Sequence, residues 1–209
     1  MNGEHVTGTG APDTAKTSAA RGRIVDAAYE LFSRNGLRAV GVDTIIAESG
    51  VAKMTLYRNF PSKDELILEF LRVREERWTR DWLQAEAERR ATTPDGRLLA
   101  IFDVFDEWFQ LDDFEGCSFV NVLLEVTDLE SPVRRASVEH LATIRTFVAG
   151  LAVEAGISDP DGFARQWHIL MKGSIVSAGE GDRLAARRAR ELGRLLLAQA
   201  LPAPAADPG

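Results

Sequence analysis

A short segment in the first third of the chain, AKMTLYRNF at residues 52–60, gathers hydrogen-bonding side chains between a Gly and a Pro. Arg can bind guanine through two hydrogen bonds and Asn can bind adenine, whereas hydroxyl and ammonium groups suit phosphate oxygens. A helix this short buries little surface by itself, so we expect most of its polar residues to contact something outside the chain. These residue types favour a nucleic acid, and the candidates for the outward face are Lys53, Met54, Thr55, Tyr57, Arg58 and Asn59.

Three apolar patterns predict the helices that must position this segment. The run RIVDAAYELFSRNG has helical spacing and stops at Gly36, VDTIIAESG stops at Gly50, and AKMTLYRNF stops at Pro61. Two short helices joined at a Gly, the second rich in polar residues, are typical of a helix-turn-helix, whose second helix enters the major groove of DNA. An inert three-helix packing unit with Tyr57 in its core is the alternative. The residues expected to pack the pair onto the first helix are Val42, Ile45, Ile46, Val51, Leu56 and Phe60.

A long helix is expected to follow. Ser62 and Glu65 have the spacing of a capping box, in which the Ser hydroxyl accepts a hydrogen bond from the amide three residues later. The helix could continue to about residue 91, which is roughly 40 Å at 1.5 Å per residue. Lys63 adds a cation at its start.

The remainder of the chain also has the pattern of helices. An N-cap residue precedes Pro at positions 93–94, 131–132 and 159–160, Asp182 could cap a last helix, and strand signals are nearly absent. The prediction is an all-α protein of about nine helices. Its expected parts are a disordered tail (1–20), a helix-turn-helix domain (21–66), a second helical domain (67–201) and a disordered C-terminal tail (202–209).

Composition and spacing exclude several classes of function. The net charge of −7 at first argues against nucleic acid, but residues 21–72 hold 8 basic and 7 acidic side chains, so the excess acid lies further along the chain. The single Cys, Cys117, and three scattered His give no zinc spacing, and no phosphate loop or nucleophile elbow is present. We therefore expect no enzyme activity, no metal and no cofactor. Without an apolar signal or spanning segment, we expect a cytoplasmic protein with no membrane partner.

The segment AAYELFSRNGLRAVGVDTIIAESGVAKMTLYRNFPSKDELI closely resembles the N-terminal domain of TetR-family transcriptional regulators of bacteria. The resemblance covers about residues 21–70. It rests on a G-V-x-x-x-T-L-Y-x-x-F-x-x-K-x-x-L core, present here as Gly50, Val51, Thr55, Leu56, Tyr57, Phe60, Lys63 and Leu66.

The resemblance implies which residues lie at the DNA surface. Two departures matter: Gly41 stands where many members carry a Thr or Ser that caps the second helix and contacts phosphate, and Met54 stands where Gly is frequent. The first puts one phosphate contact in doubt, and the second is expected to alter base preference. The implied DNA-binding residues are Ala52, Lys53, Met54, Thr55, Tyr57, Arg58, Asn59 and Lys63.

The resemblance also implies that the rest of the chain binds a small molecule and forms a homodimer. An aromatic face at helical spacing is core more often than pocket, and Asn121 and Glu125, four residues apart on a largely apolar helix, could serve structure or orient a ligand. The last two helices are expected to form the dimer interface. The candidate effector pocket consists of Trp82, Phe105, Trp108, Phe109, Phe119, Asn121, Val122, Glu125, Trp167, His168 and Met171.

The function that these expectations imply is a repressor bound to a double-stranded DNA operator and released by a small apolar or aromatic effector. The alternative is a DNA-binding regulator without a small-molecule ligand, controlled by a protein partner or by its own level. The Arg-rich face of the last helix also suggests nucleic acid, but a solvated face or pairing with acidic residues is the simpler explanation.

Overall fold

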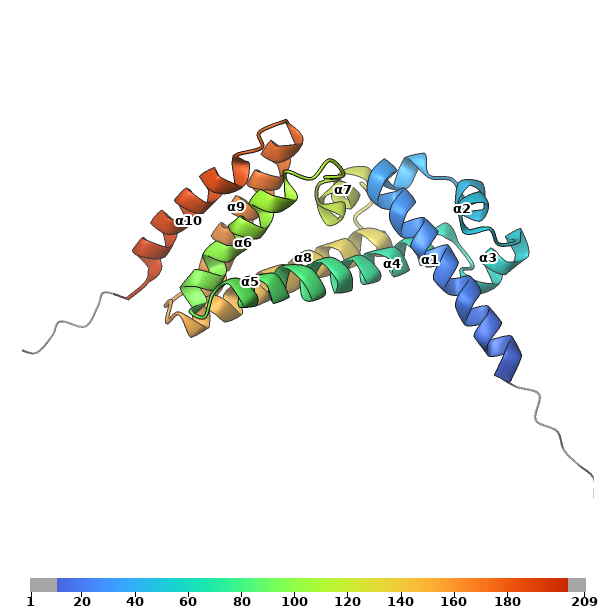
Figure 1. Ribbon diagram of the computed structural model, residues 1–209, viewed down its shortest axis with the longest axis horizontal. Helices are drawn as coiled ribbons and strands as arrows, with labels where there is room; N and C mark the ends of the chain where they lie inside the picture. The colour runs from blue at the N-terminus through green and yellow to red at the C-terminus, as the bar shows by residue number, and fades with distance from the viewer. Residues whose placement is uncertain (1–10, 203–209) are drawn as a thin grey trace, which may run out of the picture. The chain divides into compact units, whose positions relative to one another are not determined.

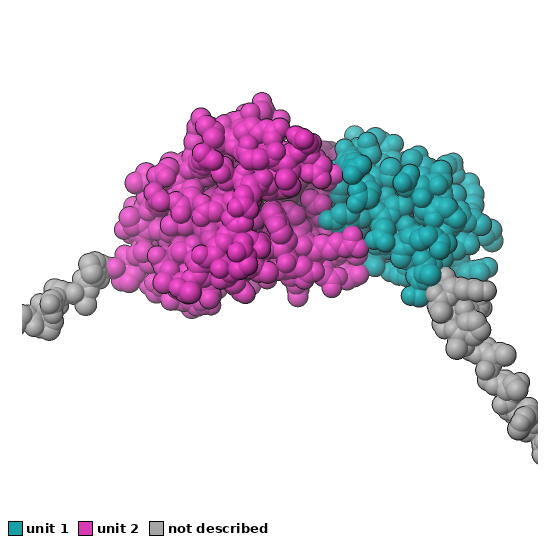
Figure 2. Space-filling model, viewed as in Figure 1, with its two compact units in different colours: residues 1–70 teal, residues 71–209 magenta. Residues whose placement is uncertain are grey.

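The computed structural model describes residues 11–202, and side chains from residue 18 onward. All regular secondary structure in this part of the chain is helical, which confirms the predicted all-α class. The chain divides into two compact units, residues 1–70 (unit 1) and 71–209 (unit 2), coloured separately in Figure 2. The boundary between the units lies four residues beyond the predicted domain boundary at 66.

Unit 1 is built from α1 (Ala11–Ala39), α2 (Val42–Ser49), α3 (Lys53–Asn59) and the first part of α4 (Lys63–Arg74), labelled in Figure 1. The prediction of a disordered tail is wrong for residues 11–20, because α1 begins at Ala11. Residues 1–10 and 203–209 of the two predicted tails lie outside the described residues.

The core of unit 1 forms where apolar residues of all four helices meet. Phe70 of α4 packs against the rings of Tyr29 and Phe32 of α1, with ring centroids 5.8 and 5.5 Å apart. Ile45 of α2 is fully buried and Leu56 of α3 is 1% exposed. The apolar spacing of each short helix therefore fixes which of its faces turns inward.

Unit 2 contains the remaining helices, which are labelled in Figure 1. They are η1 (Glu75–Gln84), α5 (Ala85–Arg90), α6 (Pro94–Trp108), α7 (Ser118–Glu125), α8 (Pro132–Glu154), α9 (Pro160–Gly179) and α10 (Ala185–Ala200). Helix α9 packs between α8 and α10, α6 contacts α5, α8 and α10, and α7 lies on α8. Thr93 and Asp159 cap α6 and α9 as predicted, whereas Ser131 stands at the N-cap of α8 without a side-chain bond.

The predicted long helix is present as a continuous rod, residues 63–90, formed by α4, η1 and α5. The Ser62 hydroxyl accepts a hydrogen bond from the Glu65 amide at 3.1 Å, as the capping box predicts. Counting the rod as one helix, and α1 as one helix despite its non-helical Gly36 (φ 75°, ψ 174°), gives nine helices between residues 11 and 202, in agreement with the predicted number. The sequence did not reveal that its middle, η1, is a π-helix, a rare form that often occurs at functional sites.

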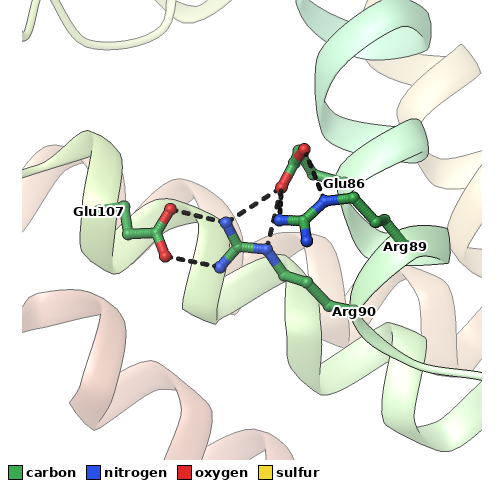
Figure 3. A network of polar contacts seen from close by, with 4 residues as sticks. All are labelled: Glu86, Arg89, Arg90 and Glu107. Carbon is green, nitrogen blue, oxygen red and sulfur yellow. Dashed lines mark hydrogen bonds and ion pairs between the residues drawn. The ribbon is translucent and has the colours of Figure 1, made fainter.

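Charged side chains connect α5 to α6, as Figure 3 shows. The Arg90 guanidinium donates to both carboxylate oxygens of Glu107 at 2.9 and 2.6 Å, and it also donates to Glu86. Arg89 donates to the same Glu86 carboxylate at 2.7 Å. These hydrogen bonds, from Arg89 first and Arg90 second, lower the pKa of Glu86 to about 2.

A glycine lets α10 approach the core of unit 2. Trp167 of α9 is fully buried between Phe102 and Phe163, with ring centroids 5.2 and 5.3 Å away. A Cβ atom at Gly193 of α10 would lie 2.8 Å from the Trp167 ring. Gly193 therefore removes the side chain that would otherwise push α10 off this aromatic stack.

Candidate functional site

Helix α3 presents one apolar and one polar face. Leu56 is 1% exposed and packs inward, whereas Met54 is 74% and Tyr57 41% exposed. The spacing therefore predicts the outward face correctly, and the alternative with Tyr57 in the core is wrong. Of the predicted DNA-binding residues, Thr55, Asn59 and Lys63 are half-buried, and the exposed ones are Ala52, Lys53, Met54, Tyr57 and Arg58.

The polar groups on this face differ in how free they are to bind a ligand. The Arg58 guanidinium and the Tyr57 hydroxyl form no hydrogen bond or ion pair with any described residue. The Lys53 ammonium lies 3.5 Å from Asp43, but both side chains are well exposed, so this pair is weak. The amide nitrogen of Asn59 donates to the Thr55 carbonyl at 2.8 Å, which leaves its oxygen as the free group.

Lys63 has a partner within the protein. Its ammonium donates to the Leu37 carbonyl at the end of α1 and lies 5.8 Å from the centroid of the Phe32 ring. The side chain therefore ties the start of α4 to α1. The DNA contact that the family resemblance implies for Lys63 stays a prediction.

The turn between α2 and α3 explains how the two helices keep their angle. Gly50 ends α2 in the left-handed conformation, with φ 63° and ψ 28°, and its amide donates to the Ile46 carbonyl at 3.1 Å. Ser49 is buried, and its hydroxyl donates to the Ile45 carbonyl at 2.7 Å. At the other end of α2, Gly41 occupies the N-cap without a side-chain cap, as its residue type requires.

A buried helical core, a glycine turn and a second short helix with an exposed polar face define a helix-turn-helix DNA-binding protein. The family models agree: "Bacterial regulatory proteins, tetR family" matches residues 24–70, and "Tetracyclin repressor-like, C-terminal domain" matches residues 94–192. A TetR-type transcriptional regulator of known structure from Streptomyces avermitilis is 31% identical, and the match covers 87% of this chain and 97% of that one, with a TM-score of 0.77. The chain belongs to the TetR family of DNA-binding transcriptional regulators.

Further relatives agree with this assignment. A TetR-family transcriptional regulator from Streptomyces coelicolor has a TM-score of 0.80 at 29% identity, over 88% of this chain and 96% of that chain. The transcriptional repressor KstR2 of Rhodococcus jostii is 39% identical over 62 residues, which cover 30% of each protein. The matches to the curated relatives span only 30% to 41% of those proteins' lengths.

Most of the predicted effector residues are buried in unit 2. Three of them are half-buried, namely Trp82, Asn121 and Glu125. The others are no more than 8% exposed: Phe105, Trp108, Phe109, Phe119, Val122, Trp167, His168 and Met171. Ring contacts connect several of them, because Trp167 and Phe105 both pack against Phe102 and Phe105 also packs against Trp108. Their role in binding a ligand stays a prediction.

Several aromatic rings pack around Trp108. Its ring centroid lies 4.8 Å from that of Phe114, 5.3 Å from Trp78 and 6.0 Å from Trp82. Aromatic rings at these distances and tilts stabilise a core beyond the area that they bury. The observed packing agrees with the simpler reading of the aromatic face as core.

His168 and Cys117 are both buried. Burial first, and then the nearby Lys172 and Arg145, lower the pKa of His168 to about 3, so its ring is neutral at pH 7. Burial raises the pKa of the Cys117 thiol, whose side chain is 8% exposed. Within residues 11–202, no group of His, Cys, Asp and Glu is arranged to hold a metal ion, and no helix is long and apolar enough to cross a membrane.

The Arg-rich face of α10 is engaged with acidic residues of the same chain. Arg187 and Arg190 bind Asp106 and Asp103 of α6 at 3.0 and 2.8 Å. Arg188 pairs with Asp182 just before α10. These cations are therefore neutralised locally, which supports the ion-pair explanation over nucleic-acid binding.

Sequence reasoning missed a cleft in unit 2 between the rod and α8. Its volume is about 610 Å³, and no predicted effector residue belongs to its lining. A stripe of small residues on α8, Ala142, Thr146 and Gly150 at intervals of four, lies along it and keeps the space open. This regular spacing of small residues was the feature of the sequence that could have indicated the cleft.

Proposed function

We propose that this regulator represses transcription by binding an operator through α3 and leaves the DNA when a small molecule binds unit 2. The exposed polar face of α3 is the observation that carries the DNA-binding part. Arg58 is exposed and free of partners in the described part of the chain, so it can bind guanine without breaking an internal bond. The Tyr57 hydroxyl and the Lys53 ammonium suit the flanking phosphates.

Met54 adds an apolar contact to this proposed interface. Its side chain is 74% exposed, although apolar residues of this size usually avoid water. In the major groove it can contact the methyl group of thymine, which distinguishes that base from cytosine. We propose Arg58 and Met54 as the main determinants of sequence preference.

Dimerisation through α9 and α10 is the second part of the proposal. Exposed apolar side chains gather on these two helices and at the N-cap of α10: Ile169, Val176, Leu184, Leu192 and Leu195, each between 46% and 69% exposed. A self-complementary interface of two helices from each chain would form a four-helix bundle. It would set two copies of α3 about 34 Å apart, one turn of DNA, for a pseudo-palindromic operator.

Release by an effector is the third part. The rod that begins at Lys63 in unit 1 continues as η1 and α5 in unit 2, so one helical segment belongs to both units. A ligand that binds more tightly to the conformation with low DNA affinity shifts the protein towards that conformation. The resulting loss of DNA-binding free energy is limited by the ligand's own preference between the two conformations, typically about 1–3 kcal/mol. The close packing around Trp108 favours the alternative without a ligand, whereas the cleft beside the rod favours an effector.

Selection of bound duplexes from a random DNA pool tests the proposed DNA binding. We expect the purified protein to enrich one pseudo-palindromic sequence, and the variant Arg58→Ala to bind it about 1–3 kcal/mol more weakly, which is roughly 5- to 150-fold. Arg135→Ala, which removes an exposed Arg of α8, outside α3 and the proposed dimer helices, is the matched control with the same charge change. Equal affinities of these two variants and the native protein for the selected duplex would reject Arg58 as a base-reading residue.

A further inference from the structure

The cleft of unit 2 has the dimensions of a ligand site. Cavities that hold small molecules usually measure about 300–1,000 Å³, and this one is about 610 Å³. One wall is the rod, with Arg80, Gln84 and Glu88, and the other is the face of α8 between Glu139 and Glu154. Figure 1 shows α8 running beside this part of the rod.

The positive charges in the cleft are already paired. The Arg80 side chain donates to the Glu75 carboxylate at 2.9 Å, and Glu75 is only 7% exposed. Arg97 donates to the Ala91 carbonyl at 3.2 Å, and its guanidinium lies 3.7 Å from the Glu154 carboxylate. Each guanidinium therefore has a carboxylate beside it that balances its charge, which weakens its attraction for an anionic ligand.

Two negative charges in the cleft are unpaired. The carboxylates of Glu88 on α5 and Glu139 on α8 form no hydrogen bond or ion pair with any residue of the described range. They belong to opposite walls of the cleft. Burial lowers the pKa of the His140 ring next to Glu139, which disfavours a compensating positive charge there. The charge left available to a ligand is therefore negative.

The same cleft offers an apolar surface. Phe147 is half-buried and Leu151 is 4% exposed, and both belong to the lining with Ala142. An aromatic ring attracts a cation through its negative face, and an aliphatic floor shields the apolar part of a ligand from water. Glu88 and Glu139 are both exposed, so a neutral apolar molecule gains nothing from them, whereas a cation gains the attraction of both carboxylates.

We propose that this cleft binds an organic cation, an amine or onium centre carried on an apolar body. The positive centre lies between Glu88 and Glu139, and the apolar body rests on Phe147 and Leu151. The role of this cation as the effector depends on the proposed release from DNA. The predicted effector class was apolar or aromatic, and the unpaired carboxylates add the requirement for positive charge.

Two ions of the same shape and opposite charge test this proposal. Isothermal titration of the full-length protein with tetraphenylphosphonium is expected to show binding to unit 2, and titration with tetraphenylborate is expected to show none. Glu88→Gln and Glu139→Gln are each expected to weaken tetraphenylphosphonium binding about 2- to 5-fold, the range for exposed ion pairs. Glu180→Gln, which changes the same charge outside the lining of the cleft, is expected to leave the affinity unchanged.

Equal binding of both ions, or no effect of the Glu88 and Glu139 variants beyond that of Glu180→Gln, would overturn the proposal. The selected DNA duplex separates this outcome from a failure of the proposed function. If the native protein binds the duplex and the phosphonium ion does not bind, the cleft proposal fails and DNA binding stands. If the phosphonium ion binds through the two carboxylates and no duplex is enriched, the cation site stands and the proposed repression fails.

Discussion

Replacing glycine by alanine is expected to act in opposite directions at two helical positions, Gly193 of α10 and Gly150 of α8. A Cβ at Gly193 would lie 2.8 Å from Cη2 of Trp167 and 3.2 Å from Cε2 of Phe102. Trp167 is fully buried and cannot swing aside. At Gly150 the added Cβ would meet nothing within 4 Å.

The magnitude of the difference follows from two terms. Alanine stabilises a helix interior by about 0.5–1 kcal/mol relative to glycine, and this gain applies at both positions. Forcing an extra carbon into a filled core costs about 1–3 kcal/mol, and this cost applies only at Gly193. Because the first term cancels, the free energies of unfolding of the two variants should differ by about 1–3 kcal/mol, with Gly150→Ala the more stable.

Thermal unfolding of both variants at one protein concentration measures this difference. The concentration must be matched because a dimer gains stability by mass action. Each kcal/mol corresponds to roughly 2–4 °C in Tm for a chain of this size. If Gly193→Ala raises Tm as much as Gly150→Ala, the tight fit of α10 against Trp167 is refuted.

The other predictions concern the start of α2 and the network of Figure 3. Gly41→Ser gives α2 the missing side-chain cap, so the free energy of unfolding should rise by a few tenths of a kcal/mol. Gel-shift titration should also show tighter DNA binding, because the added hydroxyl can contact a phosphate. If neither the stability nor the DNA affinity changes, both roles of this position are rejected. The pKa of Glu86 is lowered from 4.5 to about 2, so its interactions stabilise the fold above pH 4.5 and are lost as the pH falls towards 2. The thermal unfolding midpoints of the native protein and of the Glu86→Gln variant should therefore converge as the pH falls from 4.5 to about 2. A difference between the midpoints that stays constant would contradict a stabilising role of the ionised Glu86 carboxylate.

The helix-turn-helix could be predicted because its signals are local. Gly50 and Pro61 bound α3, and one buried residue per turn, such as Leu56, fixes the inward face. The extension of α1 to Ala11 has no comparable signal in its Ala, Thr, Ser and Lys residues. A helix already formed by buried residues such as Ile24 adds further turns at little cost, and composition does not report this cooperativity.

The effector region could be predicted only in part. Helical spacing shows that Phe105 and Trp108 face the interior, but a core and a pocket both need apolar residues there. Whether space remains depends on neighbours from other elements, and here Trp78 and Phe114 fill it. The residues of η1 carry no signal for its π-helical hydrogen bonding, and the small residues at intervals of four on α8 were a weak local sign of the cleft beside it.

The burial of Cys117 makes this chain convenient for spectroscopic labelling. Its thiol is the sole one in the sequence, and both its 8% exposure and its raised pKa slow reaction with maleimide or methanethiosulfonate reagents. A second cysteine placed at an exposed position, for example by Glu180→Cys, would take up a nitroxide or a fluorophore selectively without removal of the native one. Pulsed electron paramagnetic resonance could then measure the distance between the two nitroxides of a dimer in solution, with and without a ligand in the cleft.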